Sequence, residues 1–358
     1  MLLNSDFVGI DLFAGAGGLS LGAELAGINV SLAVENDKYA AQTYSVNHVH
    51  TTVLNDYIQK LDSIPTELHS EKKQKILFGG PPCQGFSTSN RRTNNRDNPQ
   101  NWLYKEFIRV LCLWKPDWVV FENVTGIVEF ESKAFLKIIL LDFERAGYTC
   151  SYAILNAANH GVPQNRSRFF LIGSKSGKTV NLDSLFVASS KITVKEAFSD
   201  LPIIYNAAKC DLLPYGDEAR NHYASTLRGA LVECTGHLVS HNADYVVDRY
   251  KHIKQGQNWE AIPKKLMQNY TDSSRCHTGI YYRLLEREPS VVIGNYRKNM
   301  LIHPWANRGL SVREAARLQS FPDNYVFKGS IGFQQQQVGN AVPPLLAKYV
   351  FDKIVQQI

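Results

Sequence analysis

Residues 11–22 read DLFAGAGGLSLG and carry an apolar strand pattern into a glycine-rich turn and then into a helix-like segment. Glycine lets the backbone approach a ligand closely, and the start of the following helix offers amides that lack an intrahelical partner. The spacing is not GxGxxG, because Gly18 comes too early for a dinucleotide loop. The stretch therefore predicts a strand, a ligand-binding loop and a helix of an α/β sheet, and it excludes an ordinary dehydrogenase.

The rest of the first half repeats this alternation of short apolar runs and longer amphipathic segments, which is typical of a parallel α/β sheet. Helical patterns cover 37–47, 102–115 and 133–146. Ligands of such sheets bind where the strands end. Candidate strands lie at 7–13, 30–36, 75–80, 117–123, 151–157 and 168–173, and a further short strand is expected to end near Asp56.

Residues 186 to about 305 have weak periodicity, long polar loops and interleaved basic and aromatic side chains. A chain of 358 residues is too long for one compact core, so we expect a second, loop-rich domain here. Helical patterns return in SVREAARLQSF (311–321) and from Leu345 to Ile358.

Composition restricts the class of protein. The formal net charge of +6 favours an anionic partner without requiring one. None of the six cysteines forms a CxxC pair, so no metal site is expected. The first residues lack a basic leader and no apolar run approaches the ~20 residues that span a bilayer, so a cytoplasmic protein without membrane contact is expected.

Two acids favour an adenosine-containing cofactor at the glycine loop. Glu35 follows the second strand and can accept hydrogen bonds from both ribose hydroxyls. Asp56 follows the third strand and can accept from the adenine amino group. The alternative is that both are solvated turn acids.

Cys83 stands in GGPPCQGFS (79–87), at a turn between a strand and a helix. Most lone cysteines are buried packing residues, but backbone amides at such a turn can stabilise a thiolate, and the prolines make the turn rigid. Glu122 ends the next strand, and Arg166 and Arg168 precede or begin a later one. A thiol, a carboxyl and two guanidinium groups are therefore expected at one edge of the sheet, which favours a nucleophile.

In order along the chain, these motifs resemble those of the DNA (cytosine-5)-methyltransferase family. The matching segments are DLFAGAGGLSLG, VEND, the ND pair at 55–56, GGPPCQGFS, ENV, NHGVPQNRSRFFLIG, RGLSVREAARLQSFPD and QVGNAVPP. The resemblance does not cover the variable middle region, which in this family reads the target sequence. It implies a Rossmann-like methyltransferase sheet with a smaller target-recognition domain.

The resemblance also implies roles for single residues. Cys83 would be the nucleophile, and Glu122, Arg166 and Arg168 would complete the catalytic site. Residues 87–101 closely follow Cys83, lack an apolar face and carry three arginines, so a mobile lid that contacts DNA phosphates is expected there; the alternative is a disordered polar loop. The implied S-adenosylmethionine site comprises Phe13, Ala14, Gly15, Ala16, Gly17, Gly18, Glu35, Asn36, Asp56, Pro82, Leu103, Asn340 and Ala341, and the implied DNA contacts are Ser87, Arg91, Arg92 and Arg96.

The implied catalytic domain is discontinuous, with residues 1–185 and 332–358, and the implied target-recognition domain spans 186–331. The implied activity is transfer of a methyl group to carbon 5 of a flipped cytosine in double-stranded DNA, by a bacterial monomer with a separately encoded restriction endonuclease as partner. One alternative is a tRNA cytosine-5 methyltransferase, although the Cys-Phe-Thr segment of that family is missing. The other is a catalytically inactive DNA-binding relative, although Cys83, Glu122 and Arg168 are all present.

Overall fold

The computed structural model describes residues 6–69, 72–82, 102–129, 134–182, 191–268, 279–294, 296–298 and 300–357. The chain divides into two compact units. The first unit comprises Met1–His160, Ser167–Val187 and Val342–Ile358, and the second comprises Gly161–Arg166 and Ala188–Ala341.

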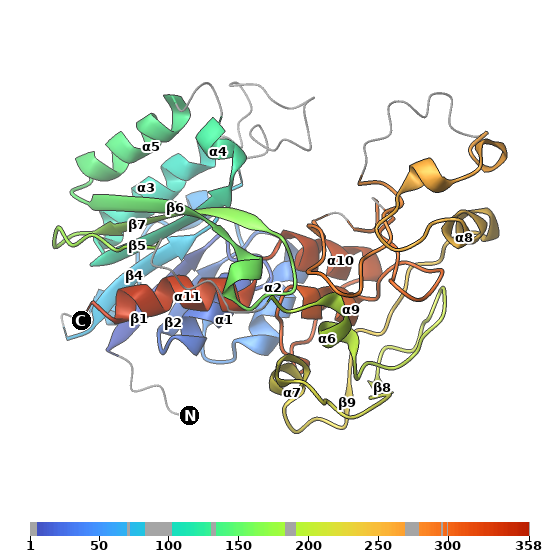
Figure 1. The fold of residues 1–358 in the computed structure, drawn as a ribbon. Helices are drawn as coiled ribbons and strands as arrows, with labels where there is room; N and C mark the ends of the chain where they lie inside the picture. Colours follow the sequence, from blue (N-terminus) through green and yellow to red (C-terminus); the bar gives the residue numbers. More distant parts are fainter. Residues whose placement is uncertain are drawn as a thin grey trace. The chain divides into compact units, whose positions relative to one another are not determined.

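A seven-stranded sheet forms the centre of the first unit, in the order β3-β2-β1-β4-β5-β7-β6 (Figure 1). The first five of these strands pair in parallel, whereas β7 runs antiparallel to both of its neighbours. The strands are β1 (Phe7–Leu12), β2 (Asn29–Val34), β3 (Thr52–Leu54), β4 (Gln74–Gly79), β5 (Trp118–Val124), β6 (Thr149–Asn156) and β7 (Ser167–Ser174).

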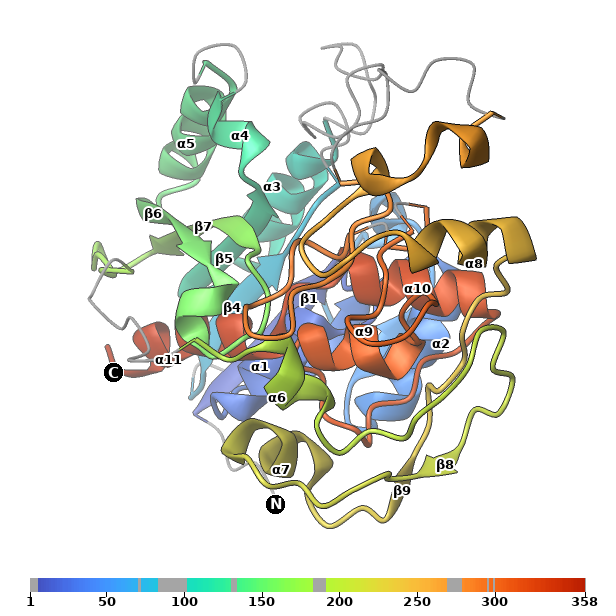
Figure 2. The same ribbon diagram turned by 45° about the vertical axis from the view of Figure 1, so that its right-hand side comes forward.

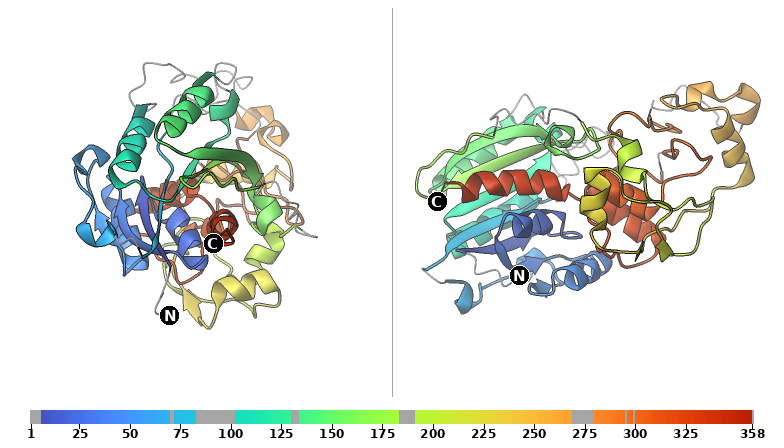
Figure 3. Two further views of the ribbon diagram at one scale, coloured as in Figure 1. Left: turned by 90° about the vertical axis from the view of Figure 1, so that its left-hand side faces the viewer. Right: turned by 60° about the horizontal axis from the view of Figure 1, so that its bottom comes forward.

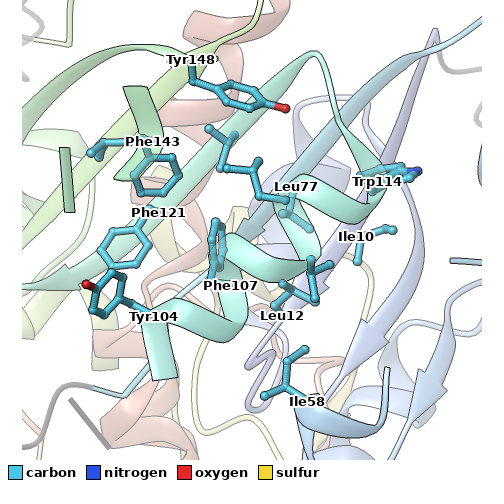
Figure 4. Packing of buried hydrophobic residues seen from close by; sticks show 14 of the residues in the cluster. Ile10, Leu12, Ile58, Leu77, Tyr104, Phe107, Trp114, Phe121, Phe143 and Tyr148 are labelled. Carbon is cyan, nitrogen blue, oxygen red and sulfur yellow. The ribbon is translucent and has the colours of Figure 1, made fainter. Parts of the chain in front are cut away.

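One face of this sheet is covered by α3 (Leu103–Trp114) and α5 (Ala134–Arg145). Side chains alternate along a strand, so Ile10 and Leu12 of β1 both point towards this face. They join one continuous core cluster with Phe107 of α3, Phe143 of α5 and Phe121 of β5 (Figure 4). Burial of such apolar side chains is the main stabilising contribution to the unit.

The opposite face carries α1 (Gly18–Leu25) and α11 (Pro344–Val355) (Figure 3). Phe78, which alternates with the α3-facing Leu77 along β4, meets Phe351 of α11 edge-on with ring centroids 5.0 Å apart. Gly22 lets the two helices approach, because a Cβ at this position would lie 2.3 Å from Cβ of Ala347. The C-terminal helix is therefore an integral part of the first unit. Next to α1 in sequence, α2 (Lys38–Asn47) buries Tyr44 against the sheet residue Ala33.

The expected strands and helices are confirmed within a few residues, and the expected α/β class is confirmed, but the sheet is not wholly parallel. The connection between β6 and β7 consists of residues 157–166, including a 3-10 turn, η6 (Ala157–His160). A parallel crossover needs about a dozen or more residues. The apolar run of β7 predicts a buried strand but does not reveal its direction.

The second unit has short elements separated by long loops. Figure 2 shows α9 and α10 side by side. Its elements are α6 (Val194–Phe198), β8 (Leu213–Pro214), α7 (His222–Arg228), β9 (Glu233–Cys234), α8 (Asp244–Lys251), η7 (Trp259–Ala261), η8 (Lys264–Leu266), α9 (Val312–Leu318) and α10 (Ile331–Asn340).

Buried ion pairs hold these short elements together. Arg317 of α9 pairs with Asp200 and with Asp323, and all three side chains are fully buried. Arg308 pairs with Glu314 at 2.7 Å, and Glu314 also closes the capping box at the start of α9. Removing one partner from such a pair leaves the other charge buried and unpaired, which typically lowers the free energy of unfolding by ~3–5 kcal/mol. The helix expected at 311–321 is thus confirmed and is the structural centre of this unit.

Candidate active site

The glycine loop after β1 has the backbone of a ligand-binding turn. Gly15 and Gly17 have φ values of 55° and 88°, and the non-glycine residue Phe13 has a φ of 58°. A bulky residue in this left-handed region is strained, and such residues gather at functional sites. A Cβ placed on Gly15 would meet no atom of the described residues within 4 Å. The loop therefore has open space beside its backbone.

Glu35 joins this loop to the end of β2. Its Oε2 accepts a hydrogen bond from the backbone N–H of Gly15, and its Oε1 accepts one from that of Asp37, both at 2.7 Å. Asn55 fixes the backbone of the same residue, because its Nδ2 donates to the Glu35 carbonyl at 2.8 Å. Burial raises the pKa of the Glu35 carboxyl, and the two amide hydrogen bonds partly oppose that rise. The carboxyl group is therefore held in one orientation at the loop.

A buried polar network lies next to the loop, and the sequence pattern alone does not predict it. The Ser20 hydroxyl donates to Asp11 Oδ2 at 2.7 Å, and the Tyr44 hydroxyl donates to Ser20 at 2.6 Å. Asp11 is fully buried, and this burial raises the pKa of its carboxyl well above its usual range. The only sequence signal was an acid within an otherwise apolar strand. The network fixes α1 and α2 to β1 below the glycine loop.

Asp56 lies on the turn after β3, as the sequence predicts. Its Oδ1 accepts from the Tyr57 amide at 2.8 Å, and its Oδ2 pairs with Lys60 at 2.9 Å. The hydrogen bond from Lys60 is the main cause that lowers the pKa of this carboxyl. Pro82 and Leu103, also expected at the cofactor site, are both half-buried.

A second cluster lies at the ends of β4 and β5. Arg168 Nε is 3.0 Å from Glu122 Oε1, and both side chains are largely buried. Glu122 Oε2 lies so close to Gly80 that a Cβ there would be 2.6 Å from it. Asn123 Nδ2 donates to the Pro81 carbonyl at 3.0 Å. The acid and its neighbour thus contact the backbone that leads directly to position 83.

The reversed direction of β7 explains why Glu122 and Arg168 meet. In the antiparallel ladder Val124 lies opposite Arg168, and Glu122 lies opposite Phe170. The start of β7 therefore falls at the edge where β5 ends. Burial lowers the pKa of the Arg168 guanidinium, while the neighbouring Glu122 opposes that effect.

The two clusters share one edge of the sheet. β1 lies between β2 and β4, and β4 lies between β1 and β5. At their carboxyl ends, β1 carries the glycine loop, β2 carries Glu35, β4 carries Gly80 and β5 carries Glu122. This edge can hold a ligand with hydroxyl groups at one end and a planar polar group at the other.

The remaining predicted residues belong to the second unit or lie outside the described residues. Arg166 belongs to the second unit and is buried, and its Nη2 donates to the Gly339 carbonyl at 3.0 Å and to that of Asn340 at 3.4 Å. Asn340, at the end of α10, and Ala341 also belong to the second unit. Cys83, Ser87, Arg91, Arg92 and Arg96 lie outside the described residues.

Within the ranges given above, no three His, Cys, Asp or Glu side chains are arranged to hold a metal ion. No helix among the described residues is both long enough and apolar enough to cross a bilayer.

Comparison with known proteins places this fold among DNA methyltransferases. A crystal structure from E. coli, described as that of a DNA modification methyltransferase encoded within a prophage, matches with a TM-score of 0.78 and 26% identity, over 98% of this chain and 99% of the other. The type II methyltransferase M.DdeI of Desulfomicrobium norvegicum is 36% identical over 96% of this chain and 88% of its own. The type II methyltransferase M1.HphI of Haemophilus parahaemolyticus is 37% identical over 97% of this chain and 86% of its own.

The sequence pattern of one family, described as C-5 cytosine-specific DNA methylase, matches residues 7–356. The chain belongs to this family, and it is a DNA (cytosine-5) methyltransferase of the restriction-modification type. The resemblance found in the sequence motifs is thereby confirmed.

Proposed function

We propose that the protein methylates carbon 5 of a cytosine extruded from duplex DNA, with Cys83 as a covalent nucleophile and S-adenosylmethionine as methyl donor, within a restriction-modification or other defence system. The observation that carries this proposal is the Glu122–Arg168 ion pair against Gly80, three residues before Cys83. A buried carboxyl and guanidinium offer a donor and acceptor pattern that matches one edge of a cytosine ring.

The cofactor fits the other end of the same edge. Glu35 uses one lone pair of each oxygen for a backbone amide, and a carboxylate has further acceptor sites for the two ribose hydroxyls. The open space at Gly15 admits the methionine part beside the loop, which includes Ala14, Ala16, Gly17 and Gly18. Bound there, S-adenosylmethionine supplies an electrophilic methyl group. The other proposed contacts are Phe13, Asn36, Asp56, Pro82, Leu103, Asn340 and Ala341.

The protein side chains make carbon 5 nucleophilic. The Cys83 thiolate adds to carbon 6 of the ring, which breaks its aromaticity and places electron density on carbon 5. Glu122, in its protonated form, donates to ring N3, and Arg168 holds the carbonyl oxygen. Positioned proton donation of this kind typically increases the reaction rate by ~100- to 10,000-fold. After methylation, loss of the carbon-5 proton to a base expels the thiolate and restores the aromatic ring.

Arg166 takes a positioning role in this proposal. Its guanidinium binds the carbonyls of Gly339 and Asn340, so it orders the segment that carries two proposed cofactor contacts.

DNA contact is proposed for two further regions. A base cannot react inside a stacked duplex and must be extruded. Ser87, Arg91, Arg92 and Arg96 contact phosphates next to the extruded base, and residues 186–331 read the target sequence. Exchange of residues 186–305 for those of a relative should move methylation, detected by bisulfite sequencing, to the relative's site. A folded chimera that keeps the old target would contradict this assignment.

A duplex with 5-fluorocytosine at the target position tests the nucleophile. Fluorine cannot leave as a cation, so the adduct at carbon 6 persists when S-adenosylmethionine is present. We expect a protein–DNA band that survives denaturing electrophoresis. Cys83→Ser should abolish the band, because a hydroxyl is a far weaker nucleophile than a thiolate at neutral pH.

Cys210→Ser is the matched control, because Cys210 is exposed in the second unit, and it should leave the band intact. An adduct formed by the Cys83 variant would place the nucleophile elsewhere. Wild-type protein that binds the duplex but forms no adduct would favour an inactive relative.

A further inference from the structure

Arg109 on α3 binds the backbone of the 3-10 turn η1 (Ile58–Lys60), which follows Asp56. Its Nη2 donates to the Ile58 carbonyl and its Nη1 donates to the Leu61 carbonyl, both at 2.8 Å. Glu106, one helical turn earlier, accepts from Arg109 Nε at 2.7 Å and fixes the plane of the guanidinium. The carbonyls of the first residue of the turn and of the residue just after it are thus bound by the fixed fork of a single side chain.

This contact joins two parts of the proposed cofactor site. Lys60, the last residue of η1, pairs with Asp56, and the Tyr57 amide just before η1 donates to the same carboxylate. On the other side of the contact, α3 begins at Leu103, about 9 Å along the helix axis from Arg109. The position of Asp56 relative to α3 therefore depends on Arg109.

The turn does not need Arg109 in order to stay folded. Ile58 and Leu61 are both buried in the main core cluster of the first unit, and Figure 4 shows Ile58 next to Leu12. Each side chain removes apolar surface from water. Loss of the guanidinium should thus loosen the turn without detaching it.

We propose that Arg109 is a positioning residue that sets how well the protein distinguishes adenine from other purines. This inference rests on the proposed function, in which Asp56 accepts a hydrogen bond from the adenine 6-amino group. An acceptor gives strong discrimination only if it is held still, because a mobile carboxylate can turn away from the carbonyl of a 6-oxo purine. Arg109 acts through the turn and does not itself touch the cofactor.

The test compares two ligands of the full-length protein by calorimetry. S-Adenosylhomocysteine carries the 6-amino group, and S-inosylhomocysteine carries a carbonyl in its place. We expect the wild type to prefer the adenosyl compound by about 10-fold or more, the effect of one hydrogen bond to a charged group. Arg109→Met should reduce this ratio to about 3-fold or less, because a loosened Asp56 binds the adenosyl compound less well and repels the inosyl compound less.

Arg145→Met is the matched control. Arg145 also lies three residues from an acid on a helix of the first unit, but its side chain is 76% exposed and its nitrogen is 3.7 Å from Asp142. The Arg145→Met variant should show the same ratio of adenosyl to inosyl affinity as the wild type. If Arg109→Met does not fold, Arg109→Lys takes its place, because lysine keeps the charge but cannot bind both carbonyls as a fork.

The possible outcomes distinguish failure of this inference from failure of the proposed function on which it rests. Wild-type protein that binds neither compound would remove the proposed cofactor. Wild-type binding without discrimination would remove the role of Asp56, and with it that of Arg109. A wild type that discriminates and a folded Arg109 variant with the same ratio would overturn this inference alone.

Discussion

Replacing Gly80 with alanine should displace the proposed proton donor while leaving the cofactor site alone. A Cβ at this position would lie 2.6 Å from Glu122 Oε2, whereas carbon and oxygen seldom approach within about 3.3 Å. The carboxyl group must therefore move by about 0.7 Å. It cannot rotate away at no cost, because Arg168 Nε holds the other oxygen at 3.0 Å.

The size of the displacement sets the expected loss. Misplacing a reacting group by about 1 Å can cost ~100-fold in rate, so kcat/KM for DNA methylation should fall by about 100-fold. Complete loss of a proton donor would cost up to ~10,000-fold, which is the upper limit. Overpacking adds ~1–3 kcal/mol of destabilisation. The glycine loop and Glu35 lie on neighbouring strands, so cofactor affinity should stay within about 2-fold, a change smaller than the loss of one hydrogen bond.

Transfer of tritiated methyl groups to plasmid DNA gives the rate, calorimetry with S-adenosylhomocysteine gives the affinity, and urea unfolding gives the stability. Gly173→Ala is the matched control: its Cβ would lie 2.5 Å from Val119 Cγ1, a similar clash in the same unit but within the sheet core. It should lose stability and keep its rate at temperatures where it is folded. Equal rates for Gly80→Ala and wild type, or equal rate losses in both variants, would refute the reasoning.

Three further predictions concern the cofactor, the packing and the effect of pH. Glu35→Ala should weaken S-adenosylhomocysteine binding by about 10-fold or more, the effect of hydrogen bonds to a charged group; unchanged affinity by calorimetry would make Glu35 a structural turn acid. Gly22→Ala should lower the free energy of unfolding in urea by ~1–3 kcal/mol, because its Cβ would lie 2.3 Å from that of Ala347. Gly309→Ala should leave this free energy unchanged, because no atom lies closer than 3.8 Å to its Cβ. Burial lowers the pKa of His303 to about 4, and an unfolded histidine titrates near ~6.5. Through His303 the second unit should therefore lose up to about 3 kcal/mol as the pH falls from ~6.5 towards ~4. Burial also lowers the pKa of His237 in the same unit to about 4, so His303→Gln should reduce the pH slope in urea unfolding without abolishing it; an unchanged slope would contradict the role of His303.

The sequence predicts those features of the fold that depend on local pattern. Apolar runs and helical periodicity locate the strands and helices of the first unit, because burial imposes these patterns directly. They do not give the direction of β7, which depends on the length of a connection and on its pairing with β5. The second unit is the opposite case. Its short elements are held by buried ion pairs such as Arg317 with Asp200, and in the sequence these charges look like those of a solvated surface.

The same distinction holds within the candidate site. Glu35 and Asp56 could be predicted because they follow strands, and the ends of parallel strands meet at one edge. Gly80 and Arg109 could not be singled out in this way. Gly80 matters because of the carboxyl group beside it, and Arg109 matters because of two carbonyls that lie 48 and 51 residues earlier in the chain. Such roles depend on tertiary contacts that the sequence pattern does not contain.

Arg166 and Arg168 show how far reasoning from a motif can reach. Residues two apart in an extended segment point to the same side, so the QNRSR motif predicts that both guanidinium groups reach one site. The chain changes units between Arg166 and Ser167, where β7 begins. Arg168 lies in the strand and pairs with Glu122, whereas Arg166 lies before it and donates to carbonyls at the end of α10. The motif therefore contributes one arginine to each unit, and the two replacements should have different effects. Arg168→Met should lower the rate of methylation, whereas Arg166→Met should lower the stability of the second unit and weaken S-adenosylhomocysteine binding through the segment at Gly339 and Asn340.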